Sequence, residues 1–179
     1  MHIRSLKHLV HAVQALVNPK RITVMGSSSL LACDPTLGEP GQLLELSLDA
    51  DLLIEPSDET LAAVLHEAVG EGSLFHGEFG VYADLLRPEI EETLPLGWRD
   101  RCSTFAGSDQ VFCLDPYDLS LAKLALGRDK DRELLRVLLA RGVIDLDHLR
   151  SRYLNTPLDE KRLFRAGRTV TALSNRNPA

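Results

Sequence analysis

The stretch Glu45-Leu46-Ser47-Leu48-Asp49-Ala50-Asp51-Leu52-Leu53-Ile54 is an apolar run that carries two carboxylates two positions apart. It predicts a buried β-strand. Side chains alternate between the two faces of a strand, so Asp49 and Asp51 share one face while Ala50 and Leu52 share the other. Two like charges side by side are unfavourable unless a cation, solvent at a sheet edge or a bound divalent metal offsets them. The pattern therefore favours a chemical role for the two carboxylates.

A second unusual stretch lies upstream and reads Ile22-Thr23-Val24-Met25-Gly26-Ser27-Ser28-Ser29-Leu30-Leu31. It predicts an apolar strand that ends abruptly in a glycine and three hydroxyl residues before a short apolar turn. Unpaired backbone N–H groups point outward where a strand, a Gly-Ser turn and a helix N-terminus meet. This stretch therefore predicts a site that can hold a phosphate group.

Together the two stretches resemble the nucleotidyltransferase superfamily with the polymerase-β-like palm. Met25-Gly26-Ser27 corresponds to its apolar-Gly-Ser element and Asp49-Ala50-Asp51 to its Asp-x-Asp strand, with a spacer longer than the commonest one. Within the superfamily the chain is most similar to small prokaryotic proteins of the AbiEii and MNT types, found in toxin–antitoxin and phage-defence loci. That similarity rests on residues 94–101, 118–124 and 127–131, and the whole resemblance covers roughly residues 20 to 140.

The resemblance implies a magnesium-dependent enzyme that transfers NMP from a nucleoside triphosphate (NTP) to a hydroxyl of RNA or of a protein. Asp49 and Asp51 would bind the metal together with a third carboxylate from a strand that pairs beside them. Asp84, late in a strand predicted over residues 79–86, is the best candidate by position. Glu78 is the substitute, and a solvent-facing Asp84 without a role is an equal alternative.

The same resemblance assigns the phosphate-binding residues. Gly26 and Ser27 would hold the β- and γ-phosphates, with Ser28 assisting. Lys123 would be a cation near the triphosphate, and Arg128 could do similar work.

The resemblance also assigns Asp131 as a helical carboxylate that orients Lys123 or takes part in proton transfer. The alternatives are a solvated lysine and an exposed ion pair of Asp131 with the neighbouring Lys130 or Arg132.

Composition limits the remaining possibilities. A chain of 179 residues with 44% hydrophobic and 26% charged residues predicts one globular domain, or one core with a helical appendage. Its three cysteines show no paired spacing, which supports neither a disulfide framework nor a zinc site and favours a cytoplasmic location. No stretch approaches the ~20 apolar residues that a membrane span needs.

Charge is distributed unevenly along the chain. Residues 150–179 contain seven Lys or Arg and two Asp or Glu, a net charge of +5, whereas residues 1–149 carry −11. An acidic body does not favour broad nucleic-acid binding through phosphate neutralisation. The basic end could contact RNA, dock on an acidic partner or simply form a solvated helix face.

The hydrophobic periodicity predicts an α+β fold with flanking helices and a C-terminal helical segment, and the resemblance implies that its mixed sheet is nucleotidyltransferase-like. We expect an α/β core over residues 1–115 and a helical segment packed on it over 116–179. Strands are predicted at 21–25, 45–54, 79–86, 103–105 and 111–114, and helices at 3–17, 61–69, 119–125 and 132–140. Ser57, Asp145 and Thr156-Pro157 are predicted helix starts, and residues 174–179 a frayed end.

Two functional hypotheses from different classes follow. The first is the magnesium-dependent enzyme, and the second is a non-catalytic binding module that acts as a toxin or antitoxin partner. Phosphate-binding P-loops, dinucleotide fingerprints and hydrolase nucleophile elbows are absent from the sequence. Convergence of Asp49, Asp51 and Asp84 within metal-bridging distance would favour the enzyme.

Overall fold

The computed structural model describes residues 1–156 and 159–174 and confirms the predicted α+β class with a mixed sheet. Two compact units divide the chain. Residues 1–88 and 101–114 form what we call the sheet unit, and residues 89–100 with the chain from Asp115 onward form the helical unit. Within the described ranges, no helix has the length and apolar character needed to cross a membrane.

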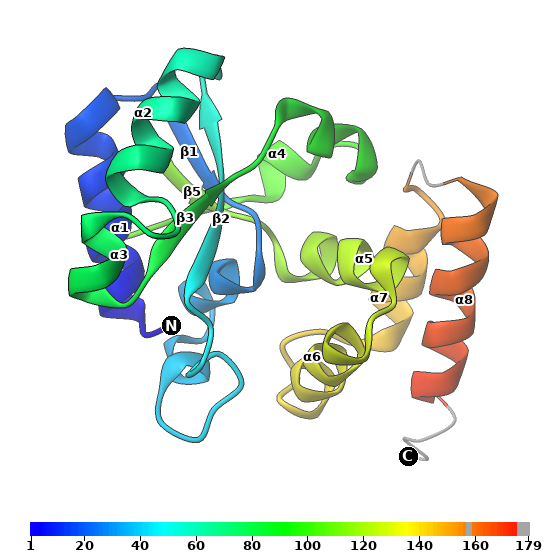
Figure 1. The fold of residues 1–179 in the computed structure, drawn as a ribbon. Coiled ribbons are helices and arrows are strands. Elements are labelled where there is room, and N and C mark those ends of the chain that lie inside the picture. Colours follow the sequence, from blue (N-terminus) through cyan, green and yellow to red (C-terminus); the bar gives the residue numbers. More distant parts are fainter. Residues whose placement is uncertain (157–158, 175–179) are drawn as a thin grey trace. The chain divides into compact units, whose positions relative to one another are not determined.

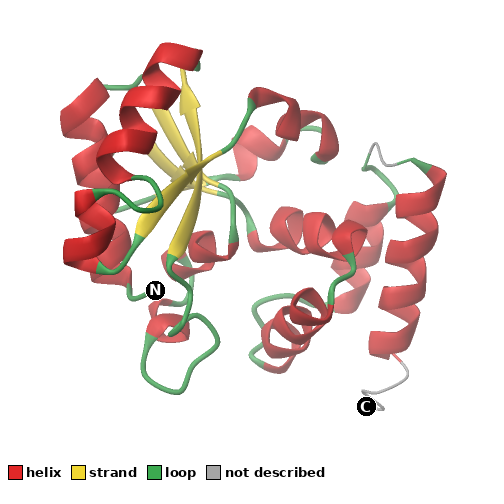
Figure 2. Cartoon of the chain, in the orientation of Figure 1, coloured by secondary structure: helices red, strands yellow, loops and turns green. Residues whose placement is uncertain are grey.

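The sheet unit holds five strands in the order β3-β2-β1-β5-β4 (Figures 1 and 2). They are β1 (Arg21–Val24), β2 (Asp49–Glu55), β3 (Tyr82–Leu85), β4 (Ser103–Thr104) and β5 (Val111–Cys113). β2 runs parallel to β3 and antiparallel to β1, while β5 runs parallel to β1 and antiparallel to β4. The predicted hairpin of β4 and β5 is therefore confirmed.

Helices of the sheet unit bury one face of the sheet. They are α1 (Ile3–Val17), α2 (Glu59–Val69) and α3 (Leu74–Phe79), while the 3₁₀ helices η1 (Ser27–Ala32) and η2 (Pro35–Gly38) follow β1. In Figure 1, α1, α2 and α3 lie on the same side of the strands. The apolar stripe of α1 is buried, as are the strand residues that alternate with the charged ones: Ile22, Val24, Ala50, Leu52, Ile54, Val111 and Cys113.

Four helices make up most of the helical unit. They are α5 (Pro116–Leu126), α6 (Asp129–Ala140), α7 (Leu146–Tyr153) and α8 (Glu160–Ser174). Asp115 and Asp145 cap α5 and α7 by accepting backbone N–H groups, and Gly127 ends α5 in the left-handed conformation that glycine adopts freely. η3 (Pro88–Thr93) and α4 (Trp98–Arg101) lie in the segment between β3 and β4. Pro157 and residues 175–179 lie outside the described residues.

The strand that carries Asp49 and Asp51, predicted over residues 45–54, begins later than predicted. β2 starts at Asp49, because the backbone of residues 44–47 is bonded within local turns. The Glu45 N–H donates to the Gln42 carbonyl and the Ser47 N–H donates to the Leu44 carbonyl, both at 3.1 Å. Leu46 is accordingly 85% exposed. Asp49 is therefore the first residue of the strand and not a residue at its centre.

Three further expectations were wrong in detail. β3 starts at Tyr82, because α3 extends to Phe79 and Gly80 ends it at φ 68°. Asp58, not Ser57, caps α2 by accepting the Leu61 N–H at 2.8 Å. The sequence also predicts that Gly26-Ser27 and the Asp49/Asp51 pair lie at one edge of the sheet, but β2 is an interior strand, because β3 occupies the edge beside it.

Candidate functional site

One face of the sheet gathers the predicted carboxylates. Asp51 of β2 lies opposite Asp84 of β3 in the parallel register, and Asp49 lies opposite Tyr82. Residues opposite each other in a register point to the same face, and so do residues two apart on a strand. Asp49, Asp51, Tyr82 and Asp84 thus share what we call the carboxylate face. Asp49 and Asp84 are exposed, whereas Asp51 is half-buried.

Sharing a face does not bring these carboxylates to a common point. Among residues 1–156 and 159–174, no group of three or more His, Cys, Asp or Glu side chains is arranged so that it could hold a metal ion. The donor chemistry nevertheless suits magnesium, which prefers hard oxygen ligands and few protein carboxylates. Glu78, the substitute third carboxylate, lies on α3, whereas Asp84 lies on the strand beside Asp51.

The Gly-Ser turn lies directly against this face. At the end of β1, the Met25 N–H donates to the Asp51 carbonyl at 2.9 Å, which holds the turn beside β2. A Cβ atom added to Gly26 would overlap the carboxylate of Asp51. Glycine is needed here for close approach, since its φ of −85° is available to any residue. The two motifs that predicted the site are therefore neighbours.

Two buried hydroxyls follow the glycine. Gly26 precedes η1, and the Ser29 N–H donates to the Gly26 carbonyl at 2.9 Å. Ser28 and Ser29 are each 1% exposed, and within the described chain neither hydroxyl has a hydrogen-bond partner. A buried polar group without a partner costs about 1–3 kcal/mol. These hydroxyls are therefore suited to a polar ligand or water. Sequence reasoning singled out Ser28 but missed Ser29.

Tyr82 is a second residue that sequence reasoning missed. It stands on the carboxylate face two positions before Asp84, so strand alternation alone could have found it. Burial raises the pKa of its phenol, and the negative charges of Glu71, Asp49, Asp84 and Asp51 raise it further. The ring also contacts His76, with the two centroids 4.7 Å apart. The phenol of Tyr82 is therefore a neutral hydrogen-bonding group surrounded by carboxylates.

The predicted cationic residues belong to the helical unit. Lys123 lies in the last turn of α5, and Arg128 precedes α6. The Arg128 guanidinium donates from Nε to Asp131 Oδ2 at 2.7 Å and from Nη2 to Asp131 Oδ1 at 3.0 Å. Asp131 is only 2% exposed, so the alternative of an exposed pair with Lys130 or Arg132 is wrong.

The ionisation of Asp131 reflects these contacts. Burial opposes its negative charge, but hydrogen bonds from the Arg128 side chain and backbone and the positive charges of Lys123 and Arg128 outweigh it. The net result is a pKa below the usual range of an aspartic acid. Asp131 is therefore ionised at neutral pH and holds the Arg128 guanidinium in place.

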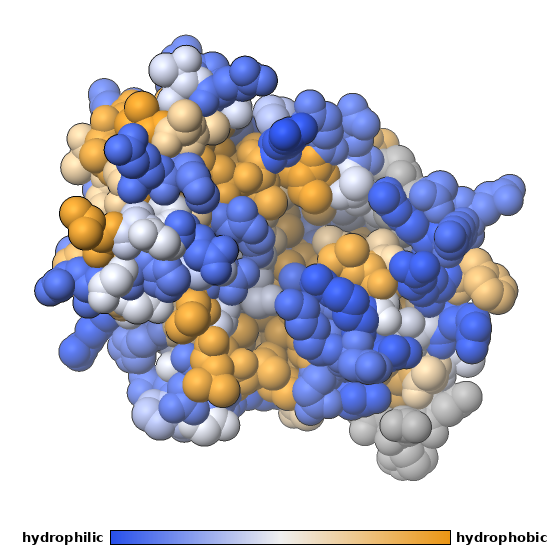
Figure 3. Space-filling view, in the orientation of Figure 1, coloured by the Kyte–Doolittle hydropathy of each residue, from blue (hydrophilic) through white to orange (hydrophobic). Residues whose placement is uncertain are grey.

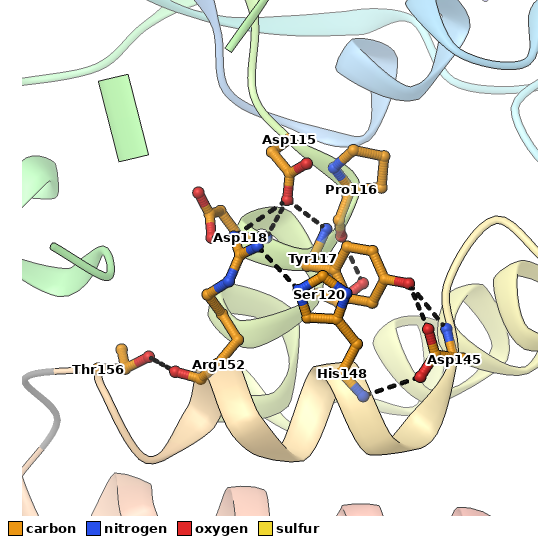
Figure 4. A network of polar contacts seen from close by, with 9 residues as sticks. All are labelled: Asp115, Pro116, Tyr117, Asp118, Ser120, Asp145, His148, Arg152 and Thr156. Carbon is orange, nitrogen blue, oxygen red and sulfur yellow. Dashed lines mark hydrogen bonds and ion pairs between the residues drawn. The ribbon is translucent and has the colours of Figure 1, made fainter. Parts of the chain in front are cut away.

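A buried ion pair joins α5 to α7 (Figure 4). The Arg152 guanidinium donates to Asp118 at 2.6 Å, and Asp118 is fully buried. Beside it, the Tyr117 hydroxyl donates to Asp145 at 2.7 Å, and the Tyr117 ring stacks on His148. The run Asp115-Pro116-Tyr117-Asp118 has the composition of a helix start, but the pairing of Asp118 is not predictable from it, because its partner Arg152 lies 34 residues away in the sequence.

A mixed sheet with a Gly-Ser turn after its first strand and an Asp-x-Asp pair on the neighbouring strand defines a nucleotidyltransferase-like protein. Residues 3–168 match the model of the family described as nucleotidyltransferase of unknown function (DUF6036). The chain belongs to this family, which confirms the superfamily resemblance and supports nucleotidyl transfer as the general kind of activity. No curated protein and no solved structure matches the chain.

Proposed function

We propose that this protein is a magnesium-dependent nucleotidyltransferase that moves NMP from an NTP to a hydroxyl of an RNA or protein acceptor. The single observation that carries the proposal is the carboxylate face. There, Asp49 and Asp51 lie on one strand, Asp84 lies opposite Asp51 on the next, and Gly26 lies against the Asp51 carboxylate. This combination supplies hard oxygen ligands beside a turn with buried hydroxyls.

Each residue of the face would have a distinct task. Asp49 and Asp51 would supply the one or two carboxylates that magnesium needs besides the substrate phosphates, with Asp84 as the candidate third ligand, and the bound ion would stabilise charge on the phosphate oxygens and align the reacting groups. Gly26 lets the Asp51 carboxylate approach the turn closely because it has no side chain, and Gly26 and Ser27 would bind the β- and γ-phosphates. Nucleotidyl transfer needs little covalent chemistry from the protein, so alignment and charge stabilisation are its main contributions.

The resemblance also assigns the two cations Lys123 and Arg128 to the phosphates of the NTP. Asp131 would orient Arg128, because it already accepts two hydrogen bonds from that guanidinium. Arginine that is fixed in this way loses less conformational entropy when it binds a phosphate.

One observation favours a second candidate function. In the described part of the chain, no three His, Cys, Asp or Glu side chains are arranged so that they could bind a metal ion. A nucleotidyltransferase fold without a metal site would serve as a non-catalytic binding module, with a cognate toxin or antitoxin protein as its partner. Either function fits a toxin–antitoxin or phage-defence system, and fold alone does not decide between them.

Calorimetric titration of each NTP, with and without magnesium, separates the two functions. The wild-type chain is compared with Asp49→Asn/Asp51→Asn. The enzyme proposal expects binding of at least one NTP that requires magnesium and that the double variant loses. Loss of about 1.4 kcal/mol of binding free energy corresponds to a tenfold weaker affinity.

The matched control is Glu67→Gln/Asp109→Asn, which removes the same two charges at exposed positions of the sheet unit. This variant should bind NTP like the wild type. A folded wild-type chain that binds no NTP would exclude the enzyme and leave the binding module. Asp84→Asn and Glu78→Gln, titrated in the same way, identify which of them supplies the third carboxylate.

A further inference from the structure

A groove lies on the helical unit, and none of the residues that line it is assigned to nucleotidyl transfer. It has a volume of about 560 Å³ and is formed by α7 and α8. Its lining residues are Tyr153, Leu163, Phe164, Gly167, Arg168, Thr171 and Ala172. Cavities that bind a ligand commonly have volumes of about 300–1,000 Å³ and mostly apolar linings.

Neighbouring contacts fix the walls of the groove. The Tyr153 hydroxyl donates to the backbone carbonyl of Leu163, which ties α7 to α8. Gly167 of α8 faces Tyr153, because a Cβ atom there would stand in ordinary van der Waals contact with the Tyr153 hydroxyl at 3.5 Å. Arg165 anchors α8 to the end of α5 by donating to the carbonyls of Ala125 and Leu126. The groove therefore lies on elements that are held in place.

Large apolar side chains remain exposed at this groove. Phe164 is 69% exposed, and Leu154, next to Tyr153, is 79% exposed. The Arg168 guanidinium lies 6.0 Å from the centre of the Phe164 ring. Figure 3 shows hydrophobic side chains among hydrophilic ones along the edge where Figure 1 draws α8. Exposed aromatic residues beside arginine are typical of protein-binding surfaces.

The charge around the groove indicates the kind of partner. α8 carries four Lys or Arg and one Glu, and residues 150–179 as a whole have a net charge of +5. We propose that this groove binds an acidic amphipathic helix of a partner protein, with an apolar side chain placed against Phe164 and acidic side chains facing the basic residues of α8. Such helix-in-groove binding uses apolar anchors at helical spacing.

The lining favours a peptide over RNA. Arg168 is the one basic residue among the lining residues. Two other arginines of α8 lie outside the lining: Arg165 donates to the Leu126 carbonyl at the end of α5, and Arg162 lies in an exposed pair with Asp159 at 3.5 Å. Binding of a nucleic-acid backbone needs several cations aligned with successive phosphates. An apolar groove with a basic surround fits an acidic helix better.

The test measures fluorescence anisotropy of labelled probes with the full chain. The probe is a synthetic amphipathic helix with Leu and Phe at helical spacing and Glu at the other positions. Its twin carries Lys in place of Glu, and a single-stranded oligoribonucleotide represents RNA. We expect binding of the acidic helix alone, weakened about tenfold by Phe164→Ala and by Arg168→Glu. Arg168→Lys should retain most of the affinity.

The matched control is Arg4→Glu, which makes the same charge change at an exposed position of α1 in the sheet unit. It should leave the affinity unchanged. Four results would each overturn the proposal: no binding of the acidic helix, equal binding of the Lys twin, tighter binding of the oligoribonucleotide, or no effect of Phe164→Ala. Circular dichroism verifies that each variant is folded.

Discussion

Gly26 is the residue at which the two sequence motifs meet. A methyl group at this position would overlap the Asp51 carboxylate, so we predict that Gly26→Ala lowers the free energy of unfolding by about 1–3 kcal/mol. Urea denaturation measures the change. In an Asp51→Ala background the penalty should shrink, because the obstructing carboxylate is gone.

Gly77 provides the control for this prediction. A Cβ atom added there meets nothing within 4 Å, and the residue lies within α3. Gly77→Ala should therefore be neutral or slightly stabilising. Equal penalties for Gly26→Ala in the wild-type and Asp51→Ala backgrounds would show that Gly26 is required for another reason.

Asp131 gives a prediction about pH. Its folded-state pKa lies below the unfolded value of about 3.9, so its ionised form stabilises the folded chain. This contribution is complete at pH 7 and is lost as the pH falls through the unfolded value towards the folded one. Asp131→Asn should therefore cost about 1–3 kcal/mol at pH 7 and progressively less in acid, measured by urea denaturation across pH.

Asp129→Asn is the matched comparison for Asp131→Asn. Asp129 pairs with Arg132 at 2.8 Å but has a fully exposed side chain, so its removal should change stability little at any pH. A constant difference between wild type and Asp131→Asn from pH 3 to pH 7 would contradict the assigned role of the Asp131 charge.

At the scale of elements, a buried ion pair joins α5 to α7 beside the Tyr117–Asp145 hydrogen bond and the stacking of Tyr117 on His148. Arg152→Met leaves the buried Asp118 without the guanidinium that donates to it at 2.6 Å. Breaking a buried pair on one side is costly, and we expect a loss of about 3 kcal/mol in the free energy of unfolding. Arg150→Met, which removes an exposed partner of Asp147, should cost less than about 1 kcal/mol. Similar losses for both variants would contradict the prediction that burial makes the Asp118–Arg152 pair more important for stability than the exposed Asp147–Arg150 pair.

Local patterns were sufficient to predict the elements with strong periodicity. Residues 3–17 form the predicted helix because their apolar residues repeat at helical spacing, and Asn18-Pro19 ends it. The strand at Asp49 was predicted too long, because Leu46 and Leu48 continue the apolar pattern into a turn. Whether an apolar residue is buried depends on partners that are distant in sequence, and local patterns do not contain them.

The candidate site was predictable to a similar extent. Asp49 and Asp51 followed from alternation on one strand, and Asp84 from its position in the next. The burial of Asp131, its bond to Arg128 and the pairing of Asp118 with Arg152 required tertiary structure. Carboxylates with buried partners carry no sequence signal that distinguishes them from exposed ones.

At the scale of the whole molecule, the chain combines units of different character. The 65 residues from Ile22 to Leu86 contain 12 Asp or Glu and no Lys or Arg, and they include the carboxylate face. Most of the basic residues lie in the helical unit. A triphosphate bound at the carboxylate face would therefore depend on magnesium for charge compensation within the sheet unit.

The division into units also predicts which fragment folds. Residues 1–114 contain all five strands with α1, α2 and α3, so we expect this fragment to unfold cooperatively in urea with the circular dichroism of an α+β protein.

Two details of the fragment design make this prediction testable. Leu94 and Trp98 belong to the helical unit and are buried, so serine at both positions should keep the fragment soluble. A shorter fragment, 1–102, lacks β4 and β5. It therefore leaves β1, which contains apolar Ile22 and Val24, as an unpaired edge strand. It should not fold, because parallel pairing with β5 completes the centre of the sheet. Cooperative unfolding of 1–102, or its absence in 1–114, would show that the sheet is not the independent unit that its contacts define.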